Sequence, residues 1–512
     1  MRSSTTKPDQ VLGQTDQAPI ERVVAVAVPV PGLGLLSYRV PDGMRSPPKG
    51  ARVSVPLGSR LVVGCVVDAD IPAPEGALLK AVAAVIDEEP FLPATIMDLA
   101  VWVGDYYASG PGDALGVAMP PAARDGLASS FRTARVAEAV GDVTADSGLT
   151  GERQREGMAL LRARPDGVAV AELQKGGVSA ATLKALERRG LVRFRQEVVE
   201  RDPFVSVVDG EATWTMGKPP TGARQLTDEQ RAAMATLETA ADAQTFRPVL
   251  LHGVTGSGKT ELYLRLASHV IGAGRRVLVL VPEIALTPAV AGLFRARFGS
   301  RVAIQHSGLS DGERHDQWHR IRRGEIDLVV GTRSAVFAPL DRLGLIVVDE
   351  EHETAYKQEE SPRYHGRDVA VMRARMEGAL VVMGTATPSL ESATNAQSGR
   401  YELVRLKRRV LDRPLAAVEI VDMRREFAAH GANVTFGQTL LAAIALRLER
   451  HEQTLVLLNR RGFASVVFCR QCGASMECPH CSVTLTFHRG ARRMRCHYCN
   501  YAVGVAKECA AC

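Results

Sequence analysis

The sequence has no long apolar run. In its 512 residues no stretch reaches the roughly 18 consecutive apolar residues that a membrane-spanning helix needs, so we expect no membrane partner. Residues 1–20 are polar and lack the apolar segment of a secretion signal. We expect this stretch to be a disordered lead-in.

Cysteine is nearly absent from most of the chain. Cys65 stands alone, and the remaining eight of the nine cysteines lie between Cys469 and Cys512. A disulfide scaffold would spread its cysteines through a short secreted chain, so this clustering indicates metal binding in a reducing compartment. The composition, 46% hydrophobic and 23% charged, is that of a globular protein. The net charge of +6 permits an anionic partner.

The clustered cysteines form four C-x-x-C pairs. They are Cys469/Cys472, Cys478/Cys481, Cys496/Cys499 and Cys509/Cys512. Two such pairs supply one tetrahedral four-thiolate site, so eight ligands predict two structural zinc ions. The spacing between the second and third pairs suits a site made of the two inner pairs, which leaves the outer pairs for the other site. Two consecutive or two interleaved sites are the alternatives.

A glycine-rich stretch in the middle of the chain fits the pattern G-x-x-x-x-G-K-[ST]. Its residues are Gly253, Val254, Thr255, Gly256, Ser257, Gly258, Lys259 and Thr260. The glycines let backbone amides turn toward phosphates, Lys259 is expected to reach the β- and γ-phosphates, and Thr260 to hold Mg²⁺. An apolar strand-like run precedes the stretch and a helix-like segment follows it, which disfavours the alternative of a glycine-rich turn with a chance lysine. We expect an ATP site.

A second motif follows an apolar strand-like run at 343–348. It is the acid cluster Asp349, Glu350, Glu351 and His352. We expect Asp349 to bind Mg²⁺ and Glu350 to orient and deprotonate the attacking water. A surface acidic turn is the alternative, but such a turn rarely follows consecutive buried aliphatic residues. Lys259, Asp349 and Glu350 are therefore the expected catalytic residues of ATP hydrolysis.

The first half of the chain predicts two small domains. Short β-like segments separated by proline and glycine turns fill residues 23–67 and predict a barrel or sandwich, followed by a helix over 96–106. Three helix-like pieces and a possible hairpin over 191–199 predict a winged helix whose recognition helix is 179–189. A winged helix that serves only as a spacer or protein contact is the alternative.

The second half predicts α/β lobes. From residue 226 onward strand-like and helix-like segments alternate, which indicates a parallel sheet covered on both faces. After residue 414 a helix at 440–450 and a strand over 453–459 predict the start of a second lobe, which the cysteine block interrupts. The predicted fold class is therefore multidomain α/β.

The order of these motifs resembles that of the bacterial replication-restart (primosomal) DNA helicases, the PriA or primosomal protein N′ family of superfamily 2. The resemblance covers the chain from about residue 22. The motifs that carry it are 253–261, 281–288, 306–309, 331–334, 349–352, 356–358, 384–388, 458–463 and the cysteine block.

The resemblance implies a domain order. It is a lead-in (1–20), a β-rich 3′-DNA-binding domain (21–125), a linker (126–150), a winged helix (151–205), a second linker (206–224), a RecA-like ATP-binding helicase lobe (225–405), the start of a second lobe (406–468) and an inserted two-zinc module (469–512). It also implies nested zinc sites. The outer site is Cys469, Cys472, Cys509 and Cys512, and the inner site is Cys478, Cys481, Cys496 and Cys499.

The implied activity is ATP-dependent 3′–5′ DNA unwinding or translocation in replication restart, with recognition of stalled forks and initiation of primosome assembly. ATP, Mg²⁺ and two Zn²⁺ are the implied cofactors. The implied partners are forked and single-stranded DNA, other primosome proteins, the replicative helicase loader and single-strand-binding protein. The implied location is the bacterial cytoplasm, with the nucleoid.

The resemblance also implies DNA contacts. Gly58 and Lys80 match the pocket for a DNA 3′ end, and Arg333 is the expected phosphate ligand. In the aromatic-rich loop within 356–367, Tyr356, Tyr364 and His365 are expected to stack on bases.

The chain departs from the family pattern at three places. Pro362 stands where the aromatic-rich loop usually carries Trp, and Leu36-Ser37 replaces the Phe-Asp pair of the 3′-end pocket. We also expect the chain, which stops at Cys512, to lack the rest of lobe two with its Gln/Arg motif. The alternative function is therefore a DNA-binding platform for primosome loading that does not unwind DNA. A phosphate-loop ATPase that acts on proteins is the third hypothesis.

Overall fold

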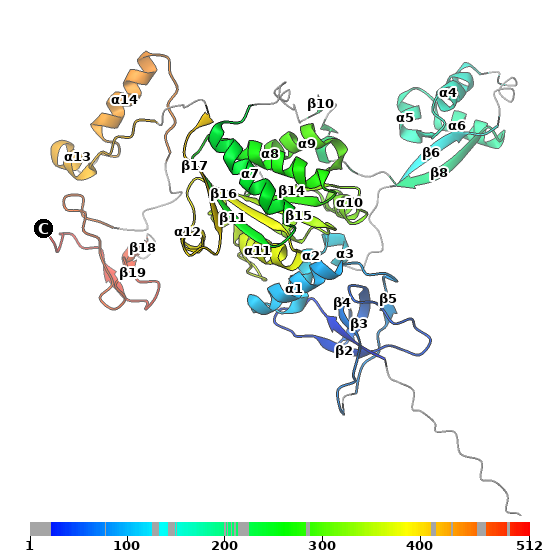
Figure 1. Ribbon diagram of the computed structural model, residues 1–512, viewed down its shortest axis with the longest axis horizontal. Helices are drawn as coiled ribbons and strands as arrows, with labels where there is room; N and C mark the ends of the chain where they lie inside the picture. The colour runs from blue at the N-terminus through cyan, green and yellow to red at the C-terminus, as the bar shows by residue number, and fades with distance from the viewer. Residues whose placement is uncertain are drawn as a thin grey trace, which may run out of the picture. The chain divides into compact units, whose positions relative to one another are not determined.

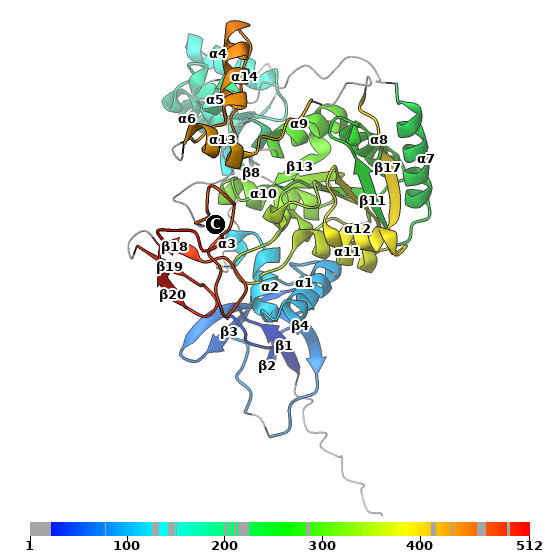
Figure 2. The ribbon, with the colours of Figure 1, turned by 90° about the vertical axis from the view of Figure 1, so that its left-hand side faces the viewer.

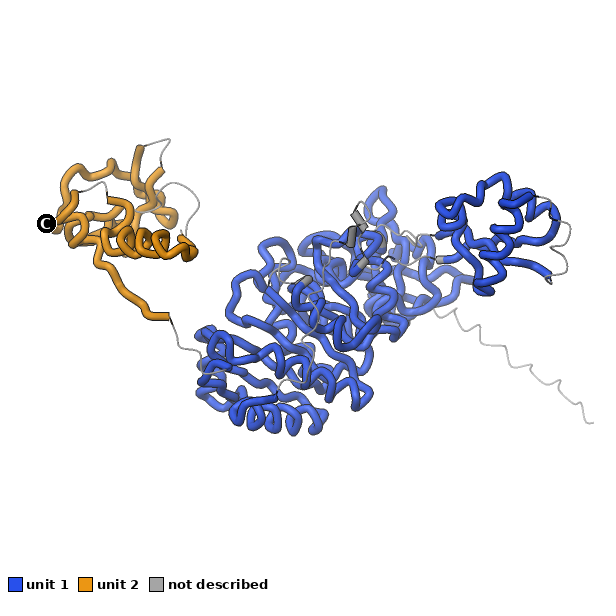
Figure 3. Tube along the Cα trace, turned by 90° about the horizontal axis from the view of Figure 1, so that it is seen from above, with its two compact units in different colours: residues 1–413 blue, residues 414–512 orange. Residues whose placement is uncertain are grey.

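The computed structural model divides the chain into two compact units, residues 1–413 and 414–512 (Figure 3). It describes residues 22–76, 78–124, 133–141, 149, 151–198, 201, 203–205, 207–208, 211–212, 225–282, 287–410, 416–431, 434–457, 467–488 and 492–512. The expected lead-in, part of the motif at 281–288 and the whole motif at 458–463 lie outside these residues. No helix of the described residues is both long enough and apolar enough to cross a bilayer.

The N-terminal part is an antiparallel sheet with three helices. Its elements are β1 Val23–Ala27, β2 Leu36–Arg39, β3 Arg52–Leu57, β4 Arg60–Ile71, β5 Ala84–Val85, α1 Ala94–Tyr106, α2 Pro111–Ala118 and α3 Pro121–Arg124. The strands lie in the order β2-β1-β4-β3-β5. Buried valines on alternate positions of β1 and β3 form the core of this sheet, as the period of a strand requires. The predicted β-rich domain is present.

A second small fold has the elements of a winged helix. They are β6 Thr133–Ala139, α4 Glu152–Arg162, β7 Val168–Ala169, α5 Val170–Lys175, α6 Ala180–Arg188 and β8 Val192–Val198, with strand order β7-β6-β8. The Ser179 hydroxyl caps α6 by accepting from the Thr182 N–H at 3.1 Å.

Two sequence expectations for this fold are wrong. β6 lies inside the stretch predicted to be a linker. The sequence did not indicate this strand because its residues are mostly small and polar, but it pairs with β8. β8 is one continuous strand instead of the predicted hairpin over 191–199, because β6 supplies its partner. After β8 the described residues include η2 Pro203–Val205, β9 Val207–Val208 and β10 Glu211–Ala212.

The largest part of the first unit is a seven-stranded parallel sheet. Its strands, in the order β13-β14-β12-β15-β16-β11-β17, are β13 Val302–Gln305, β14 Leu328–Gly331, β12 Arg276–Leu280, β15 Leu343–Asp349, β16 Leu380–Thr385, β11 Arg247–Gly253 and β17 Glu402–Leu406. Its helices are α7 Asp228–Asp242, α8 Lys259–Gly272, α9 Thr287–Phe298, η3 Gly299–Arg301, α10 Asp311–Arg322, η4 Arg333–Phe337, η5 Thr354–Tyr356, α11 Gly366–Glu377 and α12 Leu390–Gln397.

Both faces of this sheet are buried. Alternate residues of β11 illustrate the two sides, since Val249 and Leu251 pack with α7, α8 and α9, whereas Leu250 joins the cluster formed with α10 and α11. Figure 1 shows α7, α8 and α9 on one side of the sheet and α11 on the other. Strands buried on both faces read as continuous apolar runs, which is why the sequence predicted them. The α/β fold class is confirmed.

The N-terminal helices share a hydrophobic core with the large sheet. α1 and α2 lie beside α11 in both ribbon views (Figure 1, Figure 2). Phe91 stacks on Trp318 of α10 with ring centroids 4.5 Å apart and planes 10° from parallel. The Arg52 guanidinium lies 4.1 Å from the centre of the Phe91 ring and forms a two-pronged ion pair with Asp87. The β-rich domain and the large sheet are therefore joined by a packed interface.

This interface predicts an acid-sensitive stability. Burial, together with the neighbouring His315, Arg322, Arg323 and Arg52, lowers the pKa of His319 to about 3. An unfolded chain binds a proton at this histidine near pH 6.5, so the contribution of neutral His319 is fully present above that pH and is lost as the pH falls toward 3. We expect the free energy of unfolding to fall by at most about 1.4 kcal/mol from this group between pH 7.5 and 5.5.

Urea titrations at the two pH values measure this loss. A His319→Gln variant should show a smaller pH-dependent loss, whereas His430→Gln, at an exposed histidine of the second unit, should match the parent. Equal losses in the parent and in His319→Gln would contradict the assignment.

The second unit holds helices and a small antiparallel sheet. Its elements are α13 Met423–His430, α14 Gln438–Glu449, β18 Thr486–His488, β19 Arg493–Arg495 and β20 Ala502–Gly504. The expected helix at 440–450 is present as α14. The strand expected from residue 453 is absent from described residues 453–457, where Leu455 and Leu457 are 94% and 87% exposed. A strand needs a neighbour to pair its backbone groups, and the described residues of this unit supply none here.

Candidate functional site

The glycine-rich stretch forms a loop between β11 and α8. Gly256 and Gly258 have φ values of 81° and 84°, a left-handed conformation that glycine adopts without strain. A Cβ at Gly258 would lie 2.4 Å from the Gln230 side-chain nitrogen. The buried Ser257 hydroxyl has no hydrogen-bond partner within the described residues. Open amides at the N-terminus of α8 and an unused hydroxyl suit a phosphate group.

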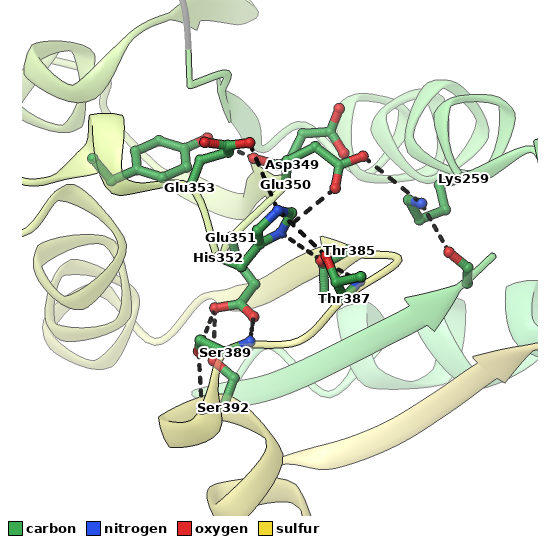
Figure 4. A network of polar contacts seen from close by, with 12 residues as sticks. Lys259, Asp349, Glu350, Glu351, His352, Glu353, Thr385, Thr387, Ser389 and Ser392 are labelled. Carbon is green, nitrogen blue, oxygen red and sulfur yellow. Dashed lines mark hydrogen bonds and ion pairs between the residues drawn. The ribbon is translucent and has the colours of Figure 1, made fainter. Parts of the chain in front are cut away.

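Lys259 and the acid cluster meet at the carboxyl end of the sheet. Lys259 Nζ donates to the Gly253 carbonyl at 2.9 Å and lies 4.0 Å from Glu350 Oε1 (Figure 4). Asp349 ends β15, and its Oδ1 accepts from the buried Tyr263 hydroxyl at 3.0 Å. Burial and the nearby Glu350 charge raise the pKa of Asp349, so a cation beside this carboxylate would favour its ionised form. The structure therefore brings together the three residues expected to be catalytic, with Thr260 in the first turn of α8.

His352 connects the acid cluster to the end of β16. Its Nδ1 lies 2.8 Å from Thr385 Oγ1 and its Nε2 lies 3.3 Å from Thr387 Oγ1. The same ring is 3.7 Å from Glu350 Oε2. Figure 4 shows the ring between the Glu350 carboxylate and the two threonines. β16 is the neighbour of β15 in the sheet, so this ring joins the ends of two adjacent strands.

A cavity of about 250 Å³ beside the phosphate loop contains residues that the sequence analysis missed. Its lining includes Gln230, Arg408, Arg409 and Ser257. Gln230 Nε2 donates to the Ser257 carbonyl at 2.8 Å, and its side-chain oxygen accepts from the Thr227 N–H in a capping box. The capping pattern Thr227-x-x-Gln230 was the sequence signal that could have drawn attention to Gln230. No sequence pattern indicates that Arg408 lies beside the same cavity. Such a polar cavity suits the base or ribose of a nucleotide.

The residues expected at a DNA 3′ end lie together. Lys80 Nζ donates to the Gly58 carbonyl at 3.1 Å. Gly58 occupies the turn between β3 and β4 with a φ of 62°, and a Cβ there would meet no atom within 4 Å. Both residues remain candidates for DNA contact.

Two of the expected stacking residues do not present an open ring. Tyr356 and Tyr364 are both 0% exposed, so in this arrangement neither ring face can receive a base, and this expectation is corrected. The buried Tyr356 hydroxyl has hydrogen-bond partners, because it lies 2.7 Å from the Asp349 carbonyl and 3.0 Å from the Leu280 carbonyl. Tyr356 thus supports the strand end that carries Asp349. His365, at the N-terminus of α11, is half-buried.

Arg333 lies at the start of η4 and fixes the aromatic-rich loop. Its Nη1 donates to the carbonyls of Lys357 and Ala355 at 2.6 and 3.3 Å. Arg333 as a residue is only partly buried, although its Nε is shielded from solvent. Arg333 therefore connects η4 to the aromatic-rich loop, whether or not it also contacts DNA.

The eight clustered thiols form two groups. Cys469, Cys472, Cys509 and Cys512 make one, and Cys478, Cys481, Cys496 and Cys499 make the other, with the sulfur atoms of each group within 4.8 Å of one another. Sγ–Sγ distances of 3.7, 3.6 and 3.5 Å occur within the groups. Tetrahedral zinc with Zn–S bonds near 2.3 Å places its sulfurs about 3.8 Å apart. The donor sets therefore fit zinc, in the nested order.

Three family models match the chain. A 3′DNA-binding domain (3′BD) matches residues 25–120, a DEAD/DEAH box helicase matches 227–396, and the PriA DNA helicase Cys-rich region (CRR) domain matches 478–503.

Curated relatives named replication restart protein PriA are similar to most of the chain. The Bacillus subtilis (strain 168) protein is 45% identical over 363 residues, which cover 70% of this chain and 44% of that protein. The Chlamydia pneumoniae protein is 35% identical over 475 residues, covering 91% and 62%. The Haemophilus influenzae protein is 34% identical over 506 residues, covering 96% and 66%. The chain thus spans about half to two thirds of these relatives' length. Because relatives of one kind match nearly the whole chain and the Cys-rich model is specific to them, this chain belongs to the replication restart protein PriA family.

Proposed function

We propose that this chain is part of an ATP-dependent 3′–5′ DNA helicase or translocase of replication restart. It recognises stalled forks and initiates primosome assembly in the cytoplasm, with the nucleoid. Its partners are DNA, other primosome proteins, the replicative helicase loader and single-strand-binding protein. The observation that carries the proposal is the meeting of Lys259 with Glu350 at 4.0 Å above a parallel sheet, since this pair serves phosphoryl transfer to water.

Each residue of the site has a role in this proposal. The loop from Gly253 to Thr260 holds the phosphates, and Lys259 neutralises their charge. Thr260 and Asp349 would hold Mg²⁺, which would supply Lewis-acid stabilisation of the transferred phosphoryl group. Glu350 orients the attacking water and accepts its proton. Each of the two thiol groups holds one structural Zn²⁺.

The test is ATP hydrolysis by the purified chain with no DNA, with single-stranded DNA and with a forked duplex. Stimulation by DNA supports the motor function. DNA binding without turnover would support the second candidate, a loading platform that does not unwind.

We predict a specific defect in DNA binding when Arg333 is replaced. We expect Arg333→Gln to weaken binding of a single-stranded oligonucleotide by several-fold, because one phosphate contact is lost. The slope of log affinity against log salt concentration should fall by about 0.7 in magnitude, the value for one contact on a single strand. Fluorescence anisotropy over a salt series measures both quantities.

A matched control is Arg405→Gln, which alters an exposed arginine on the edge strand β17. It should leave affinity and slope unchanged. Weaker binding with the parent slope would mean that Arg333 acts only by holding the loop through its bonds to Ala355 and Lys357.

A further inference from the structure

The carboxylate of Asp349 is bonded to a buried side chain that has no role in the proposed function so far. Tyr263 of α8 is 2% exposed, and its hydroxyl donates to Asp349 Oδ1 at 3.0 Å. Tyr263 follows Lys259 by four residues in α8, so the two side chains leave the same face of the helix. One helix face thus carries the lysine expected at the phosphates and the partner of the carboxylate expected at Mg²⁺.

The Tyr263 hydroxyl can orient this carboxylate without neutralising it. The last torsion of an aspartate side chain is broad, so a carboxylate with no donor at a fixed place can turn. A phenol hydroxyl supplies one donor and no positive charge. A lysine or arginine in its place would compete with a metal cation for the same negative charge. A tyrosine is therefore suited to hold a carboxylate whose charge is needed by a cation.

Gly384 on the neighbouring strand provides the space for this hydroxyl. Asp349 and Gly384 are opposite each other in the parallel pairing of β15 with β16. A Cβ at Gly384 would lie 1.7 Å from the Tyr263 hydroxyl oxygen and 2.9 Å from Cζ of its ring, closer than real Cβ atoms approach other atoms. Any side chain at position 384 would therefore displace the hydroxyl from Asp349.

The main chain of Asp349 is held by other contacts. Its carbonyl oxygen lies 2.7 Å from the Tyr356 hydroxyl, and its strand is paired with β12 and β16. Removing the Tyr263 hydroxyl should therefore free the carboxylate to turn while the end of β15 stays in place.

We propose that Tyr263 is a positioning residue that holds the Asp349 carboxylate in the orientation that binds the Mg²⁺ of the nucleotide, and that Gly384 is needed to admit its hydroxyl. This inference rests on the proposed function, because it concerns the carboxylate that the proposal assigns to Mg²⁺. In this role Tyr263 acts only through Asp349.

The experiment measures how nucleotide binding by the full chain depends on Mg²⁺. The probes are fluorescent mant-ADP and mant-AppNHp, a triphosphate analogue that is not hydrolysed, each titrated in EDTA and over a series of Mg²⁺ concentrations. Tyr263→Phe keeps the buried ring and removes the hydroxyl. We expect it to raise the half-saturating Mg²⁺ concentration by about ten-fold, the lower end of the loss caused by removing the partner of a metal-binding side chain. Affinity in EDTA should stay within about two-fold of the parent, because the phosphate loop is unchanged.

Tyr38→Phe is the matched control. It removes another buried tyrosine hydroxyl, which donates to the Pro56 carbonyl at 3.2 Å in the N-terminal sheet, and should keep the parent's dependence on Mg²⁺. Gly384→Ala should show the Mg²⁺ defect of Tyr263→Phe together with a lower unfolding temperature. Adding Tyr263→Phe to Gly384→Ala should recover part of that temperature, because the oxygen that the new methyl group meets is gone.

The outcomes separate the two proposals, and Asp349→Asn tests the first of them. If Asp349→Asn keeps the parent's dependence on Mg²⁺, or if the parent binds neither probe, the proposed function fails and the inference with it. If Asp349→Asn loses that dependence and folded Tyr263→Phe keeps it, the inference alone is overturned, and the hydroxyl serves only the stability of the fold. Thermal unfolding shows which variants fold, and should Tyr263→Phe not fold, the Mg²⁺ dependence of Gly384→Ala decides the question.

Discussion

Replacing Lys259 with alanine is expected to lower DNA-stimulated ATP turnover by about 100-fold or more, the usual effect of removing one charged group from a developing phosphoryl charge. Lys259 is 8% exposed, and its ammonium donates to the Gly253 carbonyl and faces Glu350. Its loss removes the positive charge that faces Glu350 and that neutralises the β- and γ-phosphates in the proposed function. Steady-state phosphate release in the presence of single-stranded DNA measures the effect.

The defect of Lys259→Ala should be confined to ATP hydrolysis and should not extend to DNA binding. DNA affinity of Lys259→Ala should stay within about two-fold of the parent, because the residue lies in the phosphate loop and not in η4 or the aromatic-rich loop. Lys49→Ala, which removes an exposed lysine paired with Asp98 at 2.7 Å, should hydrolyse ATP like the parent. Parental turnover in Lys259→Ala would overturn the assignment of the phosphate loop.

Removing zinc is expected to unfold residues 467–512 and leave the first unit folded. Among the described residues of this module, the buried hydrophobic core consists of Cys478, Leu485, Met494 and Cys496, and two of these belong to the inner thiol group. Its strands are three residues long. With so small a core, the free energy of metal binding supplies the folding free energy, on the order of 10 kcal/mol for a structural zinc site. Limited proteolysis after chelation should cleave within this module, while mant-ADP binding is retained.

The stoichiometry tests the same claim. Metal analysis of the parent should give about two zinc ions per chain, from eight thiolates at four per site, and Cys496→Ser should lose the inner one. Cys65→Ala is the matched control, because Cys65 is buried in the first unit beside Met97 and belongs to neither thiol group. A full zinc content in Cys496→Ser would contradict the predicted ligand set.

The sequence predicted those parts of the site that lie on short continuous stretches. The phosphate loop and the acid cluster each follow a buried strand, so their apolar runs and polar ends were readable together. The two thiol groups were predictable because C-x-x-C pairs keep their spacing in any fold. All of these are local patterns, and the structure places them as strand ends and turns.

The parts of the fold and of the site that the sequence did not predict depend on contacts between residues far apart in the chain. Glu351 and Arg367 are 16 residues apart in the chain and form a hydrogen bond of 3.0 Å, and nothing in the spacing indicates that this carboxylate of the acid cluster pairs with an arginine. The resemblance to the family's aromatic-rich loop implied stacking on bases, but Tyr356 and Tyr364 are buried in the hydrophobic cluster that includes residues of α11 and η4. The sequence did not predict β6 because its partner β8 lies more than 50 residues later in the chain. Tertiary packing decides each of these cases.

The strand order of the large sheet has a consequence for synthesis on the ribosome. β11 is the first strand of the sheet to be made, yet its neighbours are β16 and β17. From Gly253 at the end of β11 to Leu380 at the start of β16 is 380 − 253 = 127 residues, which take about 6 to 25 seconds to translate. Throughout that time β11 has two unpaired edges, the arrangement most prone to pairing with another nascent chain. Chaperone demand in vivo should therefore be greatest while residues 254–380 are being made.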